Sequence, residues 1–434
     1  MDHKQTIHRD RYLQKLIDKK ENGLIKVITG IRRCGKSYLL FEIYVDYLLS
    51  HGVESDQIIA LALDDDQNAV YRDPAELSKY VRAQIADPSR LYYVFLDEVQ
   101  FAITREEMSG KTESIALYDV LNGLLRLKNV DIYVTGSNSK MLSTDVLTAF
   151  RGRGDVVEVY PLTFREYYDY VGGDKIDAFE EYALYGGMPL VLRKKSDEEK
   201  FRYLESLFHE VYFKDISERY KIEYPDVLAE LTDDLCSSIG SLTNATKIAN
   251  TLNSVKKMKV SSATVASYLR YLTESFLFRC ARRYDIRGKK YFEYPSKYYC
   301  TDIGLRNVKL NLRQQEETHI MENIIYNELV TRGYSVDVGV VESEEKDENG
   351  RRHQVTREID FVVNRGAKRY YIQSALTISD PIKAETELKP FSLTKDFFKK
   401  IIITKSTAKS WTDDSGVLHL GLYEFLLNDE SIFQ

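Results

Sequence analysis

Short apolar runs alternate with amphipathic stretches along the first third of the chain. Five runs are apolar enough to be strands covered on both faces, namely 24–29, 57–63, 92–97, 131–136 and 156–162. Between them, apolar residues recur at helical spacing over 38–50, 74–86 and 114–127. This alternation is typical of an α/β fold with a doubly wound parallel sheet.

The pattern changes after residue 163. Helical periodicity dominates 164–225, and short helices followed by two strands joined at Arg287-Gly288-Lys289 are expected over 226–300. A helix over 318–332 and four further apolar runs predict a second α/β domain. We therefore expect four parts, with boundaries at 1–163, 164–225, 226–300 and 301–434.

Composition narrows the class of protein. The 434 residues carry 61 Lys and Arg against 67 Asp and Glu, a formal net charge of −6. No window approaches the roughly 20 apolar residues of a membrane helix, and the N-terminus has no apolar stretch typical of a secretory signal. The four cysteines lie far apart, which disfavours a zinc site or a disulfide framework. We expect a cytoplasmic protein without membrane contact.

Positive charge is concentrated in one segment. Residues 246–297 hold twelve Lys and Arg but three acidic residues, a net charge of +9 that leaves −15 on the rest of the chain. Such a segment is a candidate surface for a polyanion such as duplex DNA. The alternative is a solvated helix face followed by a charged turn.

A phosphate-binding loop is predicted between the first strand and the following helix. The sequence Gly30, Ile31, Arg32, Arg33, Cys34, Gly35, Lys36 and Ser37 matches GxxxxGK[ST]. Glycines allow backbone N–H groups to surround phosphates, and the helix N-terminus adds positive charge. Lys36 would neutralise β- and γ-phosphate oxygens, and the Ser37 hydroxyl would ligate Mg²⁺. ATP and Mg²⁺ are the expected ligands, with Tyr38 at the edge of the nucleotide site.

Two carboxylates end the apolar strand 92–97. Asp97 would hold the Mg²⁺ shell, and Glu98 would polarise the attacking water. An Asp-Glu pair is also a common strand end, but here it follows a phosphate loop about 60 residues upstream.

Small polar residues and arginines follow the next strand. Ser137 or Asn138 could hydrogen-bond the γ-phosphate or its water, while Ser139 could cap the following helix. Arg153, or its competitor Arg151, could stabilise transition-state charge within one chain or from a neighbouring subunit. A solvated surface arginine is the alternative.

Together these elements resemble AAA-type P-loop ATPases. The chain is more narrowly similar to a prokaryotic family that joins such an ATPase to a C-terminal domain of uncharacterised function, through GIRRCGKS, FLDEVQ, TGSNS, FRGRG, YGGMPLVL, KYYCTDIGLRN and REIDFVV. The resemblance implies Lys36, Ser37, Asp97 and Glu98 as nucleotide and hydrolysis residues and Ser137 or Asn138 as sensor. It also implies Arg153 as a finger, which would require a homo-oligomer if the finger acts between subunits.

The same resemblance extends to three later segments. Gly187-Met188-Pro189 resembles a GxP element whose proline contacts adenine, although a helix break explains the same residues. Residues 246–285 resemble a winged helix, with helices at 246–252 and 261–276 and a wing at 284–294 tipped by Arg287, Lys289 and Lys290. This raises the expectation of duplex DNA binding, although such modules also dock proteins.

The last domain resembles restriction-endonuclease-like folds. Glu322 and Asp360 match the positions of two metal-binding acids, but Gln373 and Ala375 replace the expected Glu and Lys. Two acids without an ammonium group would bind Mg²⁺ weakly and activate water poorly. We therefore expect a nuclease-like module without nuclease activity.

The function expected from the sequence is a Mg²⁺-dependent ATPase that couples hydrolysis to binding of DNA or of a protein partner. Two alternatives stay open: an ATP-dependent signalling switch or scaffold with little turnover, and an ATPase coupled to a degenerate nuclease.

Overall fold

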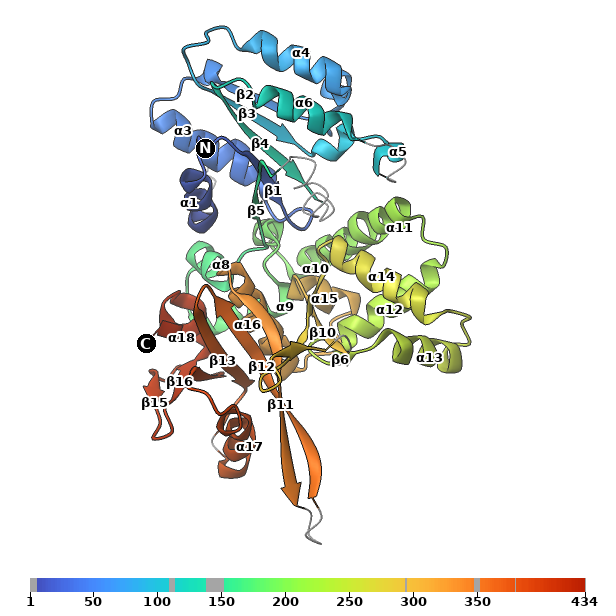
Figure 1. Ribbon diagram of the computed structural model, residues 1–434, viewed down its shortest axis with the longest axis vertical. Coiled ribbons are helices and arrows are strands. Elements are labelled where there is room, and N and C mark those ends of the chain that lie inside the picture. Colours follow the sequence, from blue (N-terminus) through green and yellow to red (C-terminus); the bar gives the residue numbers. More distant parts are fainter. Residues whose placement is uncertain are drawn as a thin grey trace. The chain divides into compact units, whose positions relative to one another are not determined.

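The structure is a computed structural model that describes residues 6–108, 114–137, 152–292, 295–346, 352–378 and 380–433 (Figure 1). The chain divides into two units, which are described separately. The first comprises Met1–Pro161 with Glu274–Phe276, and the second comprises Leu162–Thr273 with Leu277–Gln434. Among the described residues, no helix combines the length and the apolar character needed to cross a bilayer.

The first unit contains a five-stranded parallel sheet. Its strands are β1 (Ile25–Thr29), β2 (Ile58–Ala62), β3 (Tyr92–Asp97), β4 (Val130–Gly136) and β5 (Gly154–Glu158), in the order β2-β3-β4-β1-β5. Every residue of β1, β3 and β4 is buried, as continuous apolar runs predict. The predicted α/β class with a doubly wound parallel sheet is confirmed.

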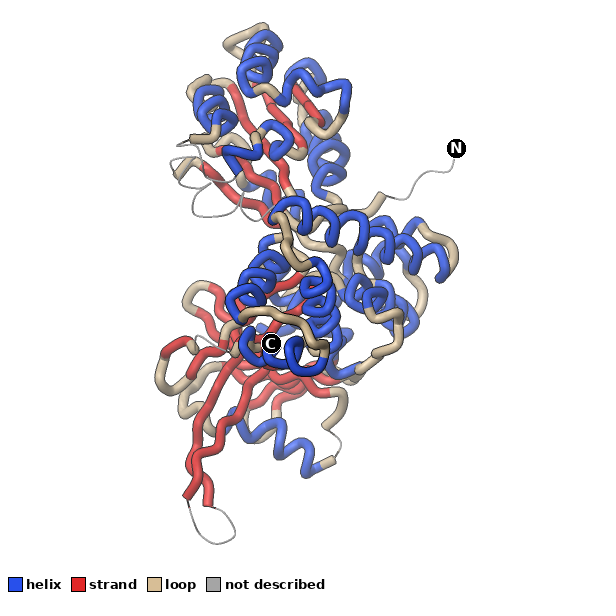
Figure 2. The backbone as a smooth tube through the Cα atoms, turned by 90° about the vertical axis from the view of Figure 1, so that its right-hand side faces the viewer, coloured by secondary structure: helices blue, strands red, loops and turns tan. Residues whose placement is uncertain are grey.

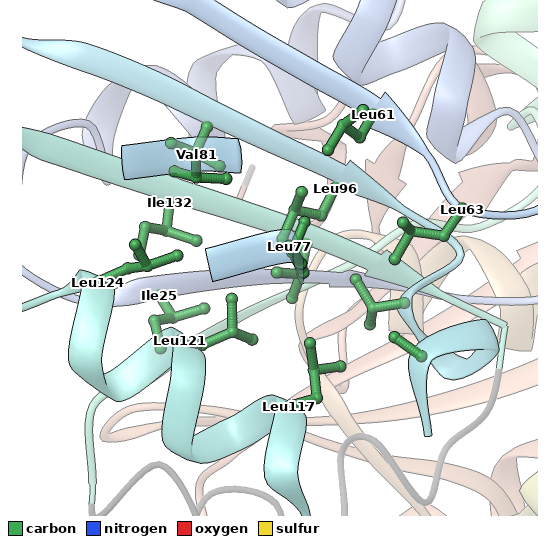
Figure 3. Packing of buried hydrophobic residues seen from close by; sticks show 14 of the residues in the cluster. Ile25, Leu61, Leu63, Leu77, Val81, Leu96, Leu117, Leu121, Leu124 and Ile132 are labelled. Atoms are coloured by element: carbon green, nitrogen blue, oxygen red, sulfur yellow. The ribbon is translucent and has the colours of Figure 1, made fainter. Parts of the chain in front are cut away.

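Helices cover this sheet and complete its core. They are α1 (Asp10–Asp18), α2 (Lys36–Tyr38), which continues through Leu39–Tyr44 into α3 (Val45–Ser50), α4 (Pro74–Gln84), α5 (Arg105–Met108) and α6 (Ala116–Leu124). Leu77 of α4 and Leu121 of α6 belong to the same apolar cluster as Leu96 and Ile132 of the strands (Figure 3). This burial fixes the sheet whose edge carries the candidate site.

The second unit begins with helices. These are α8 (Phe164–Val171), α9 (Lys175–Tyr185), α10 (Asp197–Ser206), α11 (Lys214–Tyr220), α12 (Pro225–Ser237), α13 (Ala245–Val255) and α14 (Ser262–Glu274). Thr163 and Glu166 form a capping box at α8, and the side chains of Asp174 and Asn244 cap α9 and α13. A three-stranded antiparallel sheet follows in the order β6 (Leu242–Thr243), β10 (Ser296–Cys300), β7 (Phe278–Ala281).

The rest of the second unit is built on an eight-stranded mixed sheet. Its order is β15 (Trp411–Thr412), β16 (Val417–Gly421), β14 (Lys399–Thr404), β13 (Lys368–Ala375), β12 (Arg352–Arg365), β11 (Ser335–Lys346), β8 (Arg283–Asp285), β9 (Lys290–Tyr291). The helices of this part are α15 (Ile303–Lys309), α16 (Glu317–Thr331), α17 (Pro381–Ser392) and α18 (Leu422–Leu427). Figure 2 shows β11 and β12 as a long hairpin that runs on beyond the other strands of this sheet.

Within the predicted wing at 284–294, the described strands β8 and β9 belong to the eight-stranded sheet, which the sequence did not indicate. The turn at Arg287-Gly288-Lys289 lies between β8 and β9 as expected, but β8 pairs in parallel with β11. Ile286 is buried in a cluster with Val341 and Ile359. Pairing with β11 satisfies backbone groups that a free strand edge would leave open, and the apolar cluster holds the hairpin there.

Close backbone approaches explain the glycine pair at 186–187. A Cβ at Gly187 would collide with the carbonyl oxygen of Leu162, and one at Gly186 would collide with the carboxylate of Asp302. That buried carboxylate accepts the N–H of Gly187 at 2.7 Å and of Leu305 at 3.1 Å. Burial raises the pKa of Asp302 to about 6, although these backbone donors lower it in part.

The raised pKa of Asp302 predicts a pH-dependent stability. The folded state binds this proton more tightly than the unfolded state, whose ordinary aspartate pKa is 3.8, so the contribution of Asp302 falls as pH rises from about 4 to about 6. The shift corresponds to about 3 kcal/mol. Thermal unfolding of wild type and Asp302→Asn between these pH values should show the wild type losing stability relative to the variant. Asp226→Asn, at an exposed position of α12, is the control; a constant difference between wild type and Asp302→Asn would contradict the assignment.

Candidate active site

The phosphate-binding loop follows the carboxyl end of β1, the strand between β4 and β5. Three of its residues have positive φ: Gly30 at 142°, Arg33 at 67° and Gly35 at 97°. A Cβ at Gly30 would collide with the carbonyl oxygen of Val159. The first glycine is therefore required by a close backbone approach, and the second caps α2 in the left-handed region.

Buried cations hold this loop. Lys36 is 4% exposed, and its Nζ donates to the carbonyl oxygens of Gly30 and Ile31, each at 3.1 Å. The buried Arg9 donates to the carbonyl oxygens of Cys34 at 3.3 Å and Tyr160 at 2.6 Å. Arg9 was missed by the sequence analysis, because an arginine far upstream of the loop belongs to no motif.

Ser37 and Asp97 are brought together by the fold. The buried Asp97 carboxylate accepts hydrogen bonds from the side chains of Ser37 and Thr135. Burial raises the pKa of Asp97, these two hydrogen bonds lower it, and the nearby charges of Glu98 and Asp64 raise it again. A carboxylate beside a hydroxyl is an oxygen donor set that suits Mg²⁺, so the residues fit an ion bound together with nucleotide phosphates.

Glu98 lies at the turn directly after β3. Its backbone is left-handed, with φ 50° and ψ 50°, and its N–H donates to Thr135 Oγ1 at 3.0 Å. Its carboxylate accepts from Gln100 Nε2 and, at 3.4 Å, from Ser137 Oγ. Thr135 and Gln100 were also missed by the sequence analysis, although Thr135 stands at the end of the strand that precedes the predicted sensor residues.

The remaining predicted residues do not all reach this edge. Asn138 and Arg151 lie outside the described residues. Arg153 is exposed and precedes β5, whose first residue Gly154 is in register with Ile25 at the start of β1. The loop begins after the last residue of β1, about 13 Å further along the strand. Arg153 therefore lies at the opposite end of the strands, away from the loop of its own chain. Pro189 begins a 3₁₀ segment (Pro189–Arg193) of the second unit.

The chain is similar to two domain families and to proteins of Haemophilus influenzae and Methanocaldococcus jannaschii. Residues 22–168 match a family described as AAA domain, and residues 176–316 match a domain of unknown function. An uncharacterised protein of Haemophilus influenzae is 33% identical over 407 residues, which cover 92% of this chain and 94% of that protein. An uncharacterised protein of Methanocaldococcus jannaschii is 27% identical over 403 residues, which cover 89% and 81%.

Solved structures with partial similarity include the Walker-type ATPase paby2304 of Pyrococcus abyssi, with a TM-score of 0.48 and 17% identity over 70% of this chain and 96% of that chain. The Aeropyrum pernix ORC1 protein in complex with DNA has a TM-score of 0.27 and 14% identity over 70% of this chain and 92% of that chain.

The parallel sheet, the phosphate loop and the AAA match define the first unit as a P-loop ATPase fold of the AAA class. The chain belongs to the same protein family as the Haemophilus influenzae protein, since the similarity extends over nearly the full length of both.

The second unit holds a different carboxylate cluster. Glu322 of α16 and Asp360 of β12 are buried close together. The side-chain Oε1 of Gln373 accepts a hydrogen bond from the backbone N–H of Asp360 at 3.3 Å. Ala375 is the last residue of β13, the strand position at which the resemblance leads us to expect a lysine. Yet the expectation of a site without an ammonium group is wrong, because Lys297 of β10 lies 3.0 Å from Glu322, 2.7 Å from Glu358 and 3.9 Å from Asp360.

Lys297 supplies the positive charge of this cluster. It comes from β10, which belongs to none of the motifs that predicted the acids. Burial alone would lower the pKa of the ammonium, but the charges of Glu322, Asp360 and Glu358 raise it above its usual value. Within the described ranges, no group of three or more His, Cys, Asp or Glu side chains is arranged to hold a metal ion. The ion pairs of Lys297 with Glu322, Glu358 and Asp360 form a buried network.

Removing the ammonium group should destabilise the second unit. Lys297→Met leaves up to three carboxylates without their counter-charge, and breaking a buried pair in this way costs about 3–5 kcal/mol. Chemical denaturation should show that loss, whereas Lys290→Met at an exposed position should be nearly neutral. Equal stability of the two variants would show that the network contributes little to folding.

Proposed function

We propose that the protein is a Mg²⁺-dependent ATP hydrolase that couples hydrolysis to the binding of DNA or a protein partner. The observation that carries the proposal is the convergence of Lys36, Ser37, Asp97 and Glu98 at one edge of a parallel sheet. Ligands of such sheets bind at the carboxyl ends of the strands.

Each residue has a distinct chemical task in this proposal. The loop N–H groups and Lys36 bind and neutralise the phosphates, and Ser37 with Asp97 holds Mg²⁺. The ion, when bound, neutralises charge on the phosphate oxygens. Glu98, directly after Asp97 in the turn, accepts the proton of the attacking water. Ser137 hydrogen-bonds Glu98 and, with Asn138, is the proposed sensor.

Two substitutions separate binding from turnover. Lys36→Ala should abolish ATP binding measured by calorimetry, because the phosphates lose their counter-charge. Glu98→Gln should bind ATP normally and hydrolyse it roughly 10²–10⁴ times more slowly, because the general base is lost. Lys128→Ala, exposed just before β4, is the matched control. Wild-type turnover by Glu98→Gln would refute the role of Glu98.

Arg153 and Pro189 are proposed contacts of a more specific kind. Because Arg153 lies at the edge opposite the loop of its own chain, its finger role requires a second copy of the chain in a homo-oligomer. Pro189, beside the buried Met188, is proposed to contact the adenine.

The proposed DNA-binding part is the winged-helix-like segment of the second unit. The chain order α12-β6-α13-α14-β7-β8-β9-β10 and the sheet order β6-β10-β7 support a winged helix whose usual wing is replaced by the β8–β9 hairpin. Lys247, Lys257 and Lys259 are exposed on and after α13. By contrast, Arg287 donates to the carbonyl oxygens of Leu393 after α17 at 3.1 Å and of Glu342 in β11 at 2.7 Å, so its guanidinium is already hydrogen-bonded within the protein.

We therefore expect the lysines on and after α13, rather than those of the β8–β9 hairpin, to contribute most to DNA affinity. Replacing Lys247, Lys257 and Lys259 by Glu should weaken duplex binding at least tenfold. It should also make the dependence of log K on log salt shallower by roughly 0.9 per lost phosphate contact. The double change of Lys289 and Lys290 to Glu, at exposed hairpin positions, is the control in fluorescence anisotropy titrations. If the hairpin variant weakened DNA binding more than the triple variant, the main DNA contact would lie on the β8–β9 hairpin.

The C-terminal part is proposed to be a nuclease-like fold without nuclease activity. The order α16-β11-β12-β13-α17-β14 supports this resemblance, as do the positions of Glu322 and Asp360. Gln373 and Ala375 replace two reactive groups, and Lys297 engages the acids that remain.

A further inference from the structure

The side chain of Gln100 makes an unusual set of contacts beside Glu98. It belongs to the 3₁₀ segment Val99–Ala102 that follows the turn after β3. Its Nε2 donates to Glu98 Oε2 and lies 3.4 Å from Ser137 Oγ. Its Oε1 is buried and has no hydrogen-bond partner among the residues that the structure describes.

The Gln100 amide is oriented so that its acceptor, Oε1, has no hydrogen-bond partner among the described residues. This orientation shows which neighbour its Nε2 group faces. A buried polar atom without a partner is unfavourable, because it has lost its hydrogen bonds to water. The opposite orientation would place Oε1 against a carboxylate oxygen, and two acceptors repel. Glu98 therefore determines how the Gln100 amide lies, and a charge-assisted hydrogen bond of this kind is among the stronger ones.

The contact also restricts Glu98. The left-handed backbone places Glu98 at the turn, the N–H of Glu98 is held by Thr135, and its Oε2 is held by Gln100 and Ser137. One carboxylate oxygen is thereby anchored, which defines the direction of the other. A general base works only when it is within hydrogen-bonding reach of the proton that it removes.

We infer that Gln100 is a positioning residue that orients the Glu98 carboxylate for water activation. The inference rests on the proposed ATPase function and adds to it a residue that acts on turnover through Glu98 and leaves nucleotide binding unaffected. No covalent step involves Gln100, since it donates a hydrogen bond and keeps its own protons.

Two substitutions of similar size test this role. Gln100→Met removes the donor, and Gln100→Glu replaces it by a second carboxylate. Both should lower kcat by between roughly tenfold and a hundredfold with unchanged ATP affinity. The loss in Gln100→Glu should be at least as large as that in Gln100→Met, because a second carboxylate beside Glu98 repels it. Gln84→Met, exposed at the end of α4, is the control.

The hydrogen bond itself is measured without turnover. In the wild type, a side-chain amide proton of Gln100, assigned by its absence in Gln100→Met, should resonate downfield and move upfield in Glu98→Ala. If wild type binds ATP but does not hydrolyse it, the proposed function fails, and this resonance still decides whether Gln100 holds Glu98. An unchanged kcat in Gln100→Met, weakened ATP binding in that variant, or an amide resonance unaffected by Glu98→Ala would each overturn the inference.

Discussion

Parallel register is the constraint on which the candidate site depends. β1 pairs with β4 and β5, and β4 pairs with β3, all in the same direction. Thr29, Asp97 and Gly136 therefore end their strands at one edge, where the phosphate loop, the acidic pair and the small polar residues all emerge. The same register places Arg153 at the other edge. One geometric rule thus brings three groups together and separates the fourth.

Buried carboxylates are a recurring feature, and each is stabilised by groups from a distant segment. Asp97 is held by Ser37 and Thr135, Asp302 by the N–H of Gly187, and Glu322 by Lys297. An unpaired buried charge would cost far more than these contacts contribute. Such pairs therefore also specify which segments lie together. The close packing of Gly186 and Gly187 against Asp302 explains the motifs YGG and TDIG without a ligand.

The basic segment shows how tertiary structure redistributes a linear signal. Its net charge of +9 suggested a single DNA-binding surface. In the structure, Lys297 is buried among acids, and Arg287 donates to the carbonyl oxygens of Glu342 in β11 and of Leu393 after α17. Lys247, Lys257 and Lys259 remain exposed beside α13. Charge counting cannot separate these roles, because burial is decided by partners that lie 25 to more than 100 residues away.

The parallel sheet, the phosphate loop and the acidic pair could be predicted from local sequence patterns. These patterns are continuous apolar strands, glycines in the phosphate loop, and polar residues where strands end. Four other features became visible in the three-dimensional arrangement alone: Thr135 and Gln100 contact the acidic pair, Arg9 hydrogen-bonds the loop, Lys297 supplies the ammonium group that the motif lacks, and β8 pairs with β11. Each of these contacts depends on how strands pair or how a turn is built, which a linear residue pattern does not show. Burial then strengthens the contact, because buried polar groups interact in a low dielectric.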